Sequence, residues 1–263
     1  MFLQPNVSVE EFNTAMASHG WCVFSDAIPA VLIERLREDM DAAYLIRRGI
    51  QQKNGVDVNT DGTLHHLVDF PSFIDLLREM YCDNFLKSYF DGNYILNSYG
   101  GVINMQNKAS YVCNIHRDVR TFTGNIHMML NMLVMIDDFT LENGATYVLS
   151  GSHLKPEKPE EAQFFQKSDR VVGKAGSILL FDSNLWHAAG QNQTESVRRA
   201  LTLTFTKPYM KPQLDYPRYI GYDTGDSLPE GLRQVLGYNA RIPVDLNEWY
   251  QPPHLRMYRP GQG

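Results

Sequence analysis

The first part of the chain, residues 1–92, carries apolar positions at helical spacing. Between residues 29 and 48 these positions recur every three or four residues, which predicts a helix with one buried face. They are Leu32, Ile33, Leu36, Met40 and Ala43. Ser8 followed by Glu11 has the form of a capping box, so a shorter helix is predicted to begin there. The segment 72–81 repeats the helical period. We therefore expect residues 1–92 to form a mostly helical support.

The pattern changes at residue 93. From there to residue 206 the apolar runs are short, rich in β-branched residues and separated by turn signals. Six or more such runs predict the strands of a sandwich or closed barrel. The runs are 93–106, 127–138, 145–151, 170–174, 177–182 and 198–206. In the last run the side chains alternate, so Arg198 and Thr202 should face one side of the sheet and Arg199 the other.

Length and composition favour one domain. The chain has 263 residues, of which 43% are hydrophobic, and this is enough for a single sizeable core. No segment has the composition of an interdomain linker. We therefore expect one domain over residues 1–263, with a helical part at 1–92, a β core at 93–206 and a Pro- and Tyr-rich extension at 207–263. Within the extension, one helix is expected at 229–237.

Charge and cysteine content narrow the partners. The net charge is −6 without a basic stripe, which argues against nucleic acid or an anionic membrane surface as a partner. The N-terminus lacks the charged and apolar regions of a signal peptide, and no run of about 18 apolar residues predicts a membrane span. Three widely spaced cysteines do not suggest a disulfide framework. These features favour a cytoplasmic protein whose substrate is a small molecule.

A His-Arg-Asp triplet at 116–118 allows two chemistries. In a protein kinase it opens the catalytic loop, but that loop needs an Asn five residues after the Asp, and this chain has Thr123 there. No Gly-rich phosphate loop precedes the triplet either. In a mononuclear iron oxygenase, His116 and Asp118 would be two of three metal ligands in a two-His-one-carboxylate site. The metal interpretation is therefore favoured.

The third ligand should be a second histidine. Of the eight histidines in the chain, His187 is the strongest candidate because it directly follows the apolar run 177–182. Arg198 begins the next run, eleven residues later. A planar guanidinium at that depth of a barrel can pair with the C5 carboxylate of 2-oxoglutarate through two hydrogen bonds. Arg199 is the alternative, but the spacing favours Arg198.

The ordered set of motifs resembles the phytanoyl-CoA dioxygenase family. It consists of His116-x-Asp118, then ENGATYVLSGSH at 142–153, then His187 with Arg198 eleven residues on. The resemblance extends over roughly residues 8–240. It implies a double-stranded β-helix, the jelly-roll of cupins, with flanking helices. It also implies iron(II), 2-oxoglutarate and O₂, with His116, Asp118 and His187 as both the catalytic residues and the metal ligands.

The resemblance further implies oxidation of an unactivated C–H bond, most simply hydroxylation, with release of succinate and CO₂. Halogenation is disfavoured because halogenases of the family have a small residue where this chain has Asp118. In relatives, an amide on the strand before the triplet contacts the cosubstrate's C1 carboxylate. Asn104, and after it Gln106, are therefore candidates for cosubstrate binding.

Two alternatives stay open from the sequence. The chain could be a redox-inactive, cupin-like protein that binds a metal or a small molecule. It could also be an oxygenase that does not use 2-oxoglutarate, in which case Arg198 would be dispensable. Taken singly, a His-x-Asp pair is often a surface feature and a lone histidine is often part of a core.

Overall fold

Two β-sheets form the centre of the molecule. The computed structural model describes residues 2–3, 7–56, 62–108 and 110–262. Within these ranges the larger sheet has the order β1-β2-β8-β5-β10-β4-β3 and the smaller has the order β7-β6-β9. The larger sheet comprises β1 (Phe2–Leu3), β2 (Trp21–Phe24), β8 (Ile178–Asp182), β5 (Met129–Met135), β10 (Arg198–Thr206), β4 (Ile95–Asn104) and β3 (Thr63–Leu64). The smaller comprises β7 (Asp169–Val171), β6 (Thr146–Val148) and β9 (His187–Ala188).

The strand pairs follow jelly-roll pairing. All pairs are antiparallel except β1 with β2. The central pairs β10–β4 and β10–β5 join segments about 70 to 100 residues apart in sequence, as expected when strands alternate between two sheets. The predicted double-stranded β-helix with flanking helices is confirmed.

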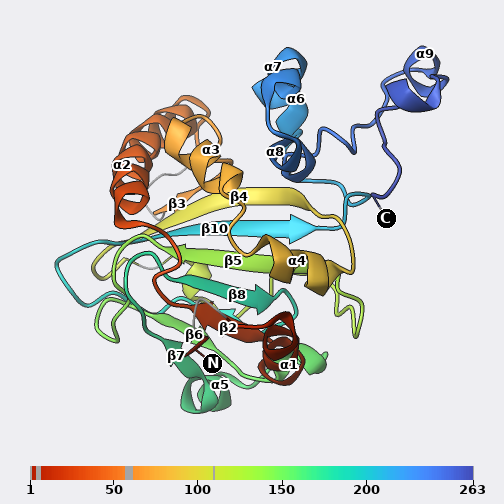
Figure 1. The fold of residues 1–263 in the computed structure, drawn as a ribbon. Coiled ribbons are helices and arrows are strands. Elements are labelled where there is room, and N and C mark those ends of the chain that lie inside the picture. Colours follow the sequence, from red (N-terminus) through yellow and green to blue (C-terminus); the bar gives the residue numbers. More distant parts are fainter. Residues whose placement is uncertain (1, 4–6, 57–61, 109, 263) are drawn as a thin grey trace.

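Helices cover one face of the larger sheet, as Figure 1 shows. They are α1 (Val9–His19), α2 (Ala30–Lys53), α3 (Pro71–Arg78) and α4 (Asp83–Phe90), and α5 (Glu161–Lys167) lies near the smaller sheet. The capping box predicted at Ser8 and Glu11 is present, with reciprocal hydrogen bonds. Within the described part of residues 1–92, these first four helices hold most of the regular secondary structure. Across the described ranges, no helix is both long enough and apolar enough to cross a membrane.

Two sequence-based expectations differ from the structure. Helix α2 continues to Lys53, beyond the predicted end at residue 48, because its last turns lie on the surface and need no apolar residues. Residues 57–61, in the polar segment after α2, lie outside the described part. The C-terminal extension holds more than the single predicted helix α8 (Glu230–Val235). The others are α6 (Tyr216–Ile220), α7 (Tyr222–Ser227) and α9 (Leu246–Trp249), and the 3₁₀ turns of the molecule are η1 (Tyr111–Cys113), η2 (Ser152–Leu154) and η3 (Pro253–Leu255).

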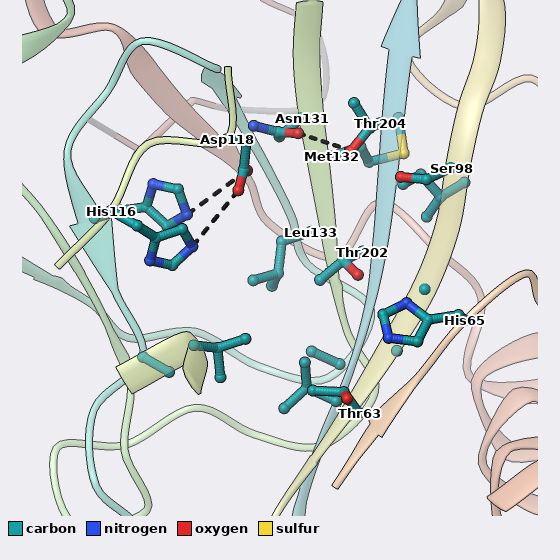
Figure 2. Close-up of a pocket in the computed structure, with 18 of the residues that line it drawn as sticks. Thr63, His65, Ser98, His116, Asp118, Asn131, Met132, Leu133, Thr202 and Thr204 are labelled. Carbon is teal, nitrogen blue, oxygen red and sulfur yellow. Dashed lines mark hydrogen bonds and ion pairs between the residues drawn. The ribbon is translucent and has the colours of Figure 1, made fainter. Parts of the chain in front are cut away.

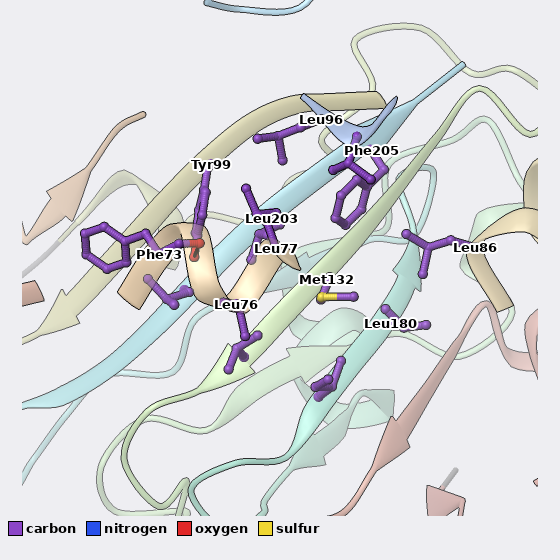
Figure 3. Close-up of a cluster of buried hydrophobic side chains, with 14 of the residues drawn as sticks. Phe73, Leu76, Leu77, Leu86, Leu96, Tyr99, Met132, Leu180, Leu203 and Phe205 are labelled. Atoms are coloured by element: carbon purple, nitrogen blue, oxygen red, sulfur yellow. Dashed lines mark hydrogen bonds between the residues drawn. The ribbon is translucent and has the colours of Figure 1, made fainter. Parts of the chain in front are cut away.

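The two faces of the larger sheet have different roles. On the helix side, Leu201, Leu203 and Phe205 of β10 join a large apolar cluster with side chains of α3 and α4 (Figure 3). On the other side, Arg198, Thr202 and Thr204 of the same strand line a cavity. The alternation predicted for β10 is therefore confirmed. Since a one-residue slip would exchange the two faces, burial of the apolar face holds the register that turns these polar side chains inward.

Gly144 is needed where the chain enters β6. Its φ is +85°, and a Cβ there would lie 2.3 Å from the Gly190 carbonyl oxygen. We therefore expect Gly144→Ala to lower the free energy of unfolding by at least about 2 kcal/mol, measured by urea denaturation. Gly49, exposed within α2 with open space around it, is the matched control. Gly49→Ala should raise the same free energy by up to about 1 kcal/mol. Equal effects of the two substitutions would contradict this interpretation.

Candidate metal centre

Three side chains from two segments meet at one end of the cavity. His116 and Asp118 follow the η1 turn, and His187 begins β9. The two histidines pair as an isolated antiparallel bridge, with mutual backbone N–H···O bonds of 3.0 and 2.9 Å. One donor atom from each of His116, Asp118 and His187 lies within 4.8 Å of the others (Figure 2). The structure thus brings together the three residues that the sequence suggested as ligands.

The two imidazole rings are held in one orientation. His116 Nδ1 lies 2.7 Å from the Asn114 carbonyl oxygen, and His187 Nδ1 lies 2.9 Å from the Leu185 carbonyl oxygen. A carbonyl only accepts a hydrogen bond, so Nδ1 of each ring carries the proton when the ring is neutral. The lone pair is then on Nε2, the atom that faces Asp118. A backbone carbonyl behind each ring is the usual arrangement for histidine metal ligands.

The Asp118 carboxylate lies between the two rings. Its oxygens are 3.5 Å from His116 Nε2 and 3.7 Å from His187 Nε2. Burial raises its pKa, but His187, His116 and the Asn131 amide outweigh that effect, and the pKa lies below the usual value. Burial lowers the pKa of His187 to about 4. An ionised carboxylate beside a neutral imidazole is the protonation state in which both can bind a metal.

The loop that carries Asp118 is fixed by the turn after β8. The backbone N–H groups of Asp118 and Val119 both donate to the Ser183 carbonyl, at 3.1 and 3.3 Å. That turn is itself held by Asp182, whose carboxylate accepts from the Asn184 N–H at 2.7 Å and from the Tyr89 hydroxyl at 2.8 Å. The long-range contact to Tyr89 explains why the sequence around the triplet does not by itself reveal how the site is supported.

A cavity of about 500 Å³ opens from these three side chains. Its wall includes Arg198, Thr202, Thr204, Ser98, Asn131, Leu133, Thr63, His65, Thr146 and Arg120. Figure 2 shows side chains of the larger sheet directed into this space. Among the lining residues that the structure describes, Asp118 is the one carboxylate. The volume is within the range of roughly 300–1,000 Å³ typical of small-molecule sites.

Arg198 is a buried cation with unused hydrogen-bonding capacity. It is 2% exposed, and its guanidinium lies 4.2 Å from the centre of the Phe139 ring. Nε and Nη2 have no hydrogen-bond partner within the described ranges. Burial lowers the pKa of Arg198 to about 10, so the side chain is still charged near neutral pH. A buried charge of this kind is costly to the fold unless it has a partner, which suggests an anionic ligand.

Arg199, the alternative cation, faces the other way. Its guanidinium donates to Asp41 on α2 and to Asp137, at distances of 2.8 to 3.0 Å. These ion pairs tie α2 to the helix-covered face of the sheet. Because its hydrogen bonds are satisfied away from the cavity, Arg199 is not a candidate for an anion ligand inside it.

The two amides suggested by the resemblance do not reach the cavity. Asn104 pairs with Arg198 in the β4–β10 register, but its side chain is buried and donates to the Gly190 carbonyl at 2.9 Å. Gln106 is exposed and donates to the Gln193 carbonyl. Since neither lines the cavity, their positions do not support the predicted contact with a cosubstrate. Gln106 lies beyond the end of β4, so alternation along the strand no longer sets its direction.

Asn131, Thr204 and Ser98 were missed by the sequence interpretation. They occupy one row across β5, β10 and β4, because Thr204 pairs with Asn131 on one side and Ser98 on the other. The signal for Asn131 was present, since a single amide interrupts the apolar run at 127–138. Recognising the row requires the register between strands that lie about 70 to 100 residues apart.

Comparison with protein families gives one match of high coverage. The model of the family described as Phytanoyl-CoA dioxygenase (PhyH) matches residues 16–200, which is more than half of the chain. This range includes the triplet at 116–118, His187 and Arg198.

Two relatives and one solved structure are similar to the chain. Rv1501 of Mycobacterium tuberculosis is 39% identical over 56% of this chain and 54% of its own length, so the chain spans about half the length of that relative. The dioxygenase cdmA of Talaromyces verruculosus is 24% identical over 96% of this chain and 91% of its own. EctD from S. alaskensis with 2-oxoglutarate and 5-hydroxyectoine has a TM-score of 0.62 at 18% identity, covering 76% of each chain. At 18% identity, the similarity to EctD concerns the fold alone.

Proposed function

The chain belongs to the phytanoyl-CoA dioxygenase family, and on this premise we propose that it hydroxylates an unactivated C–H bond of a small molecule. The cosubstrates are 2-oxoglutarate and O₂, and the metal is iron(II), as in the family. His116, Asp118 and His187 are the proposed metal ligands. Arg198 is the proposed anchor of the 2-oxoglutarate C5 carboxylate.

The single observation that carries the proposal is the pairing of two features in one cavity. One is a set of two imidazoles and one carboxylate with their donor atoms within 4.8 Å of each other. The other is the buried guanidinium of Arg198, with Nε and Nη2 unpaired within the described part of the chain. The donor set suits iron(II) with positions left for other ligands. The guanidinium suits the far carboxylate of a dicarboxylic keto acid. The residues therefore fit both groups.

The chain's own residues would contribute orientation, charge and exclusion of water. The carbonyls of Asn114 and Leu185 keep the Nε2 lone pairs of the two histidines directed at the metal position. Arg198 would hold one end of the keto acid, so that its other end meets the metal in one pose. The apolar wall, including Leu133, limits water around the reacting groups. Bound iron(II) with 2-oxoglutarate supplies the activation of O₂ and the oxidative decarboxylation to succinate and CO₂.

The cavity also supports a proposal for the substrate class. Part of the roughly 500 Å³ would be taken by 2-oxoglutarate, and the rest has room for a small molecule or a biosynthetic intermediate. Asp118 is the one acidic group among the described lining residues, and it is assigned to the metal. A cationic substrate would find no counter-charge in this part of the cavity. We therefore propose a neutral or anionic substrate with oxygen-bearing groups, which the hydroxyls of Ser98 and Thr202 can meet.

Succinate formation tests the proposed reaction. The purified protein is incubated in air with iron(II) and 2-oxoglutarate, and succinate is measured by mass spectrometry. We expect slow succinate formation that requires iron and is lost in His116→Ala. Binding of iron and 2-oxoglutarate without any succinate would instead support a redox-inactive binding protein. Succinate-free O₂ consumption that persists in Arg198→Met would support an oxygenase that uses no 2-oxoglutarate.

A further inference from the structure

A short chain of hydrogen bonds leads from the cavity wall to the candidate metal ligand Asp118. The Thr204 hydroxyl on β10 donates to the Asn131 side-chain oxygen on β5 at 3.0 Å. Asn131 Nδ2 in turn donates to the Ser183 hydroxyl at 3.2 Å, and the Ser183 carbonyl accepts the backbone N–H of Asp118 at 3.1 Å. Figure 2 shows Asn131 between Thr204 and Asp118.

The Asn131 amide has a hydrogen-bond partner at each end. Its oxygen accepts from the Thr204 hydroxyl, and its nitrogen donates to the Ser183 hydroxyl. Both partners are hydroxyls, which can donate or accept, so the amide is satisfied at both ends. The amide is 4% exposed and so is not free to turn into solvent, and it links β10 to the Ser183 turn.

We propose that Asn131 is a positioning residue that holds Asp118 in place for the metal through the Ser183 turn, with Thr204 holding the amide from β10. This inference rests on the proposed function, since it assigns Asp118 to the metal. The carboxylate itself contacts His116 and His187. When a metal takes the two imidazole nitrogens, the backbone bond from Asp118 to the Ser183 carbonyl still holds the loop that carries the carboxylate.

The same residue also braces the loop that carries the ligand. The Ser183 hydroxyl receives the Asn131 amide, while the Ser183 carbonyl accepts the backbone N–H of Asp118. Asn131 therefore acts through Ser183 on the backbone of one ligand. Residues that hold a metal ligand by hydrogen bonds typically contribute about 10- to 100-fold to metal affinity.

The test compares cobalt(II) affinity and absorption in four variants. Asn131→Leu should lower cobalt(II) affinity by about 10- to 100-fold and change the ligand-field absorption of the saturated protein. Thr204→Val removes the hydroxyl and should give a smaller loss, up to about tenfold. Thr204→Ser keeps the hydroxyl and should restore wild-type affinity. Asn97→Leu is the control, because Asn97 is equally buried but donates to the Lys211 carbonyl outside the cavity.

Each outcome decides the proposal. Wild-type affinity and absorption in both Asn131→Leu and Thr204→Val would overturn it. So would an equal loss in Asn97→Leu, because the effect would then be one of general stability. If Asn131→Leu does not fold, the difference between Thr204→Val and Thr204→Ser decides alone. Wild-type protein that binds no cobalt(II) would instead overturn the metal site itself, so failure of the proposed function is distinguishable.

Discussion

His187→Ala is expected to lower the affinity for iron(II) by more than about a hundredfold. Loss of a residue that only hydrogen-bonds to a metal ligand already costs about 10- to 100-fold, and loss of the ligand itself should cost more. His187 is 7% exposed, and its Nε2 is directed toward Asp118 at 3.7 Å. Alanine removes one of three protein donors. The other histidines of the described cavity wall, His65 and His66, lie outside the cluster of close donor atoms and cannot replace it. The measurement is anaerobic calorimetric titration of the apo-protein with iron(II).

The matched control for this prediction is His65→Ala. His65 lines the same cavity but is exposed and lies outside the cluster of close donor atoms found among the described residues. It should keep wild-type affinity for iron(II). An equal loss in both variants would indicate non-specific binding by surface histidines. Retention of tight binding in His187→Ala would exclude this residue as a ligand.

Arg198→Met is expected to weaken 2-oxoglutarate binding by about 2–5 kcal/mol, or roughly 30- to 4,000-fold, the usual effect of removing one member of a buried charge pair. The stability of the apo-protein should move the other way. Because the guanidinium is buried with two nitrogens unpaired within the described ranges, a methionine of similar volume should leave the thermal midpoint unchanged or raise it. Calorimetry with zinc-loaded protein and thermal denaturation of the apo-protein give the two quantities.

Two comparisons separate anchoring from a structural role. 2-Oxopentanoate lacks the C5 carboxylate, so it should bind wild-type protein weakly and should bind the Arg198→Met variant about as well as 2-oxoglutarate does. Arg199→Met is the neighbouring control. It breaks the ion pairs to Asp41 and Asp137, so it should lower the thermal midpoint while leaving 2-oxoglutarate affinity unchanged. A large loss of apo stability in Arg198→Met, with 2-oxoglutarate affinity retained, would contradict the assignment.

Local patterns in the sequence predicted much of the fold. The helical period at 29–48 and the alternation along β10 report which face of an element is buried, and burial decides register and direction. The alternation places Arg198 and Arg199 on opposite faces of the sheet, and the spacing from His187 favoured Arg198 as the one that enters the cavity. Helix ends without apolar residues, such as the last turns of α2, carry no such signal. The short C-terminal helices are too brief to show a period.

The candidate site was predictable to a different extent. His116 and Asp118 are separated by one residue and share one loop, so their proximity follows from spacing. The position of His187 after the apolar run 177–182 marked it as the strongest third ligand, but its placement beside His116 depends on a bridge between segments 71 residues apart, which local sequence does not show. Asn104 had the right register opposite Arg198, yet its amide turns to a nearby carbonyl. Side-chain partners of this kind depend on loop geometry, which local sequence does not specify.

The most direct test of the central claim is an anaerobic titration of the apo-protein with iron(II) and 2-oxoglutarate, followed by visible absorption. A keto acid that chelates iron(II) through its carboxylate and 2-oxo groups produces a metal-to-ligand charge-transfer band. We expect this band in the wild-type protein, its loss in His116→Ala and a much higher 2-oxoglutarate requirement in Arg198→Met. Absence of the band in folded wild-type protein that binds iron(II) would contradict the 2-oxoglutarate assignment, and the family likeness would then describe the fold alone.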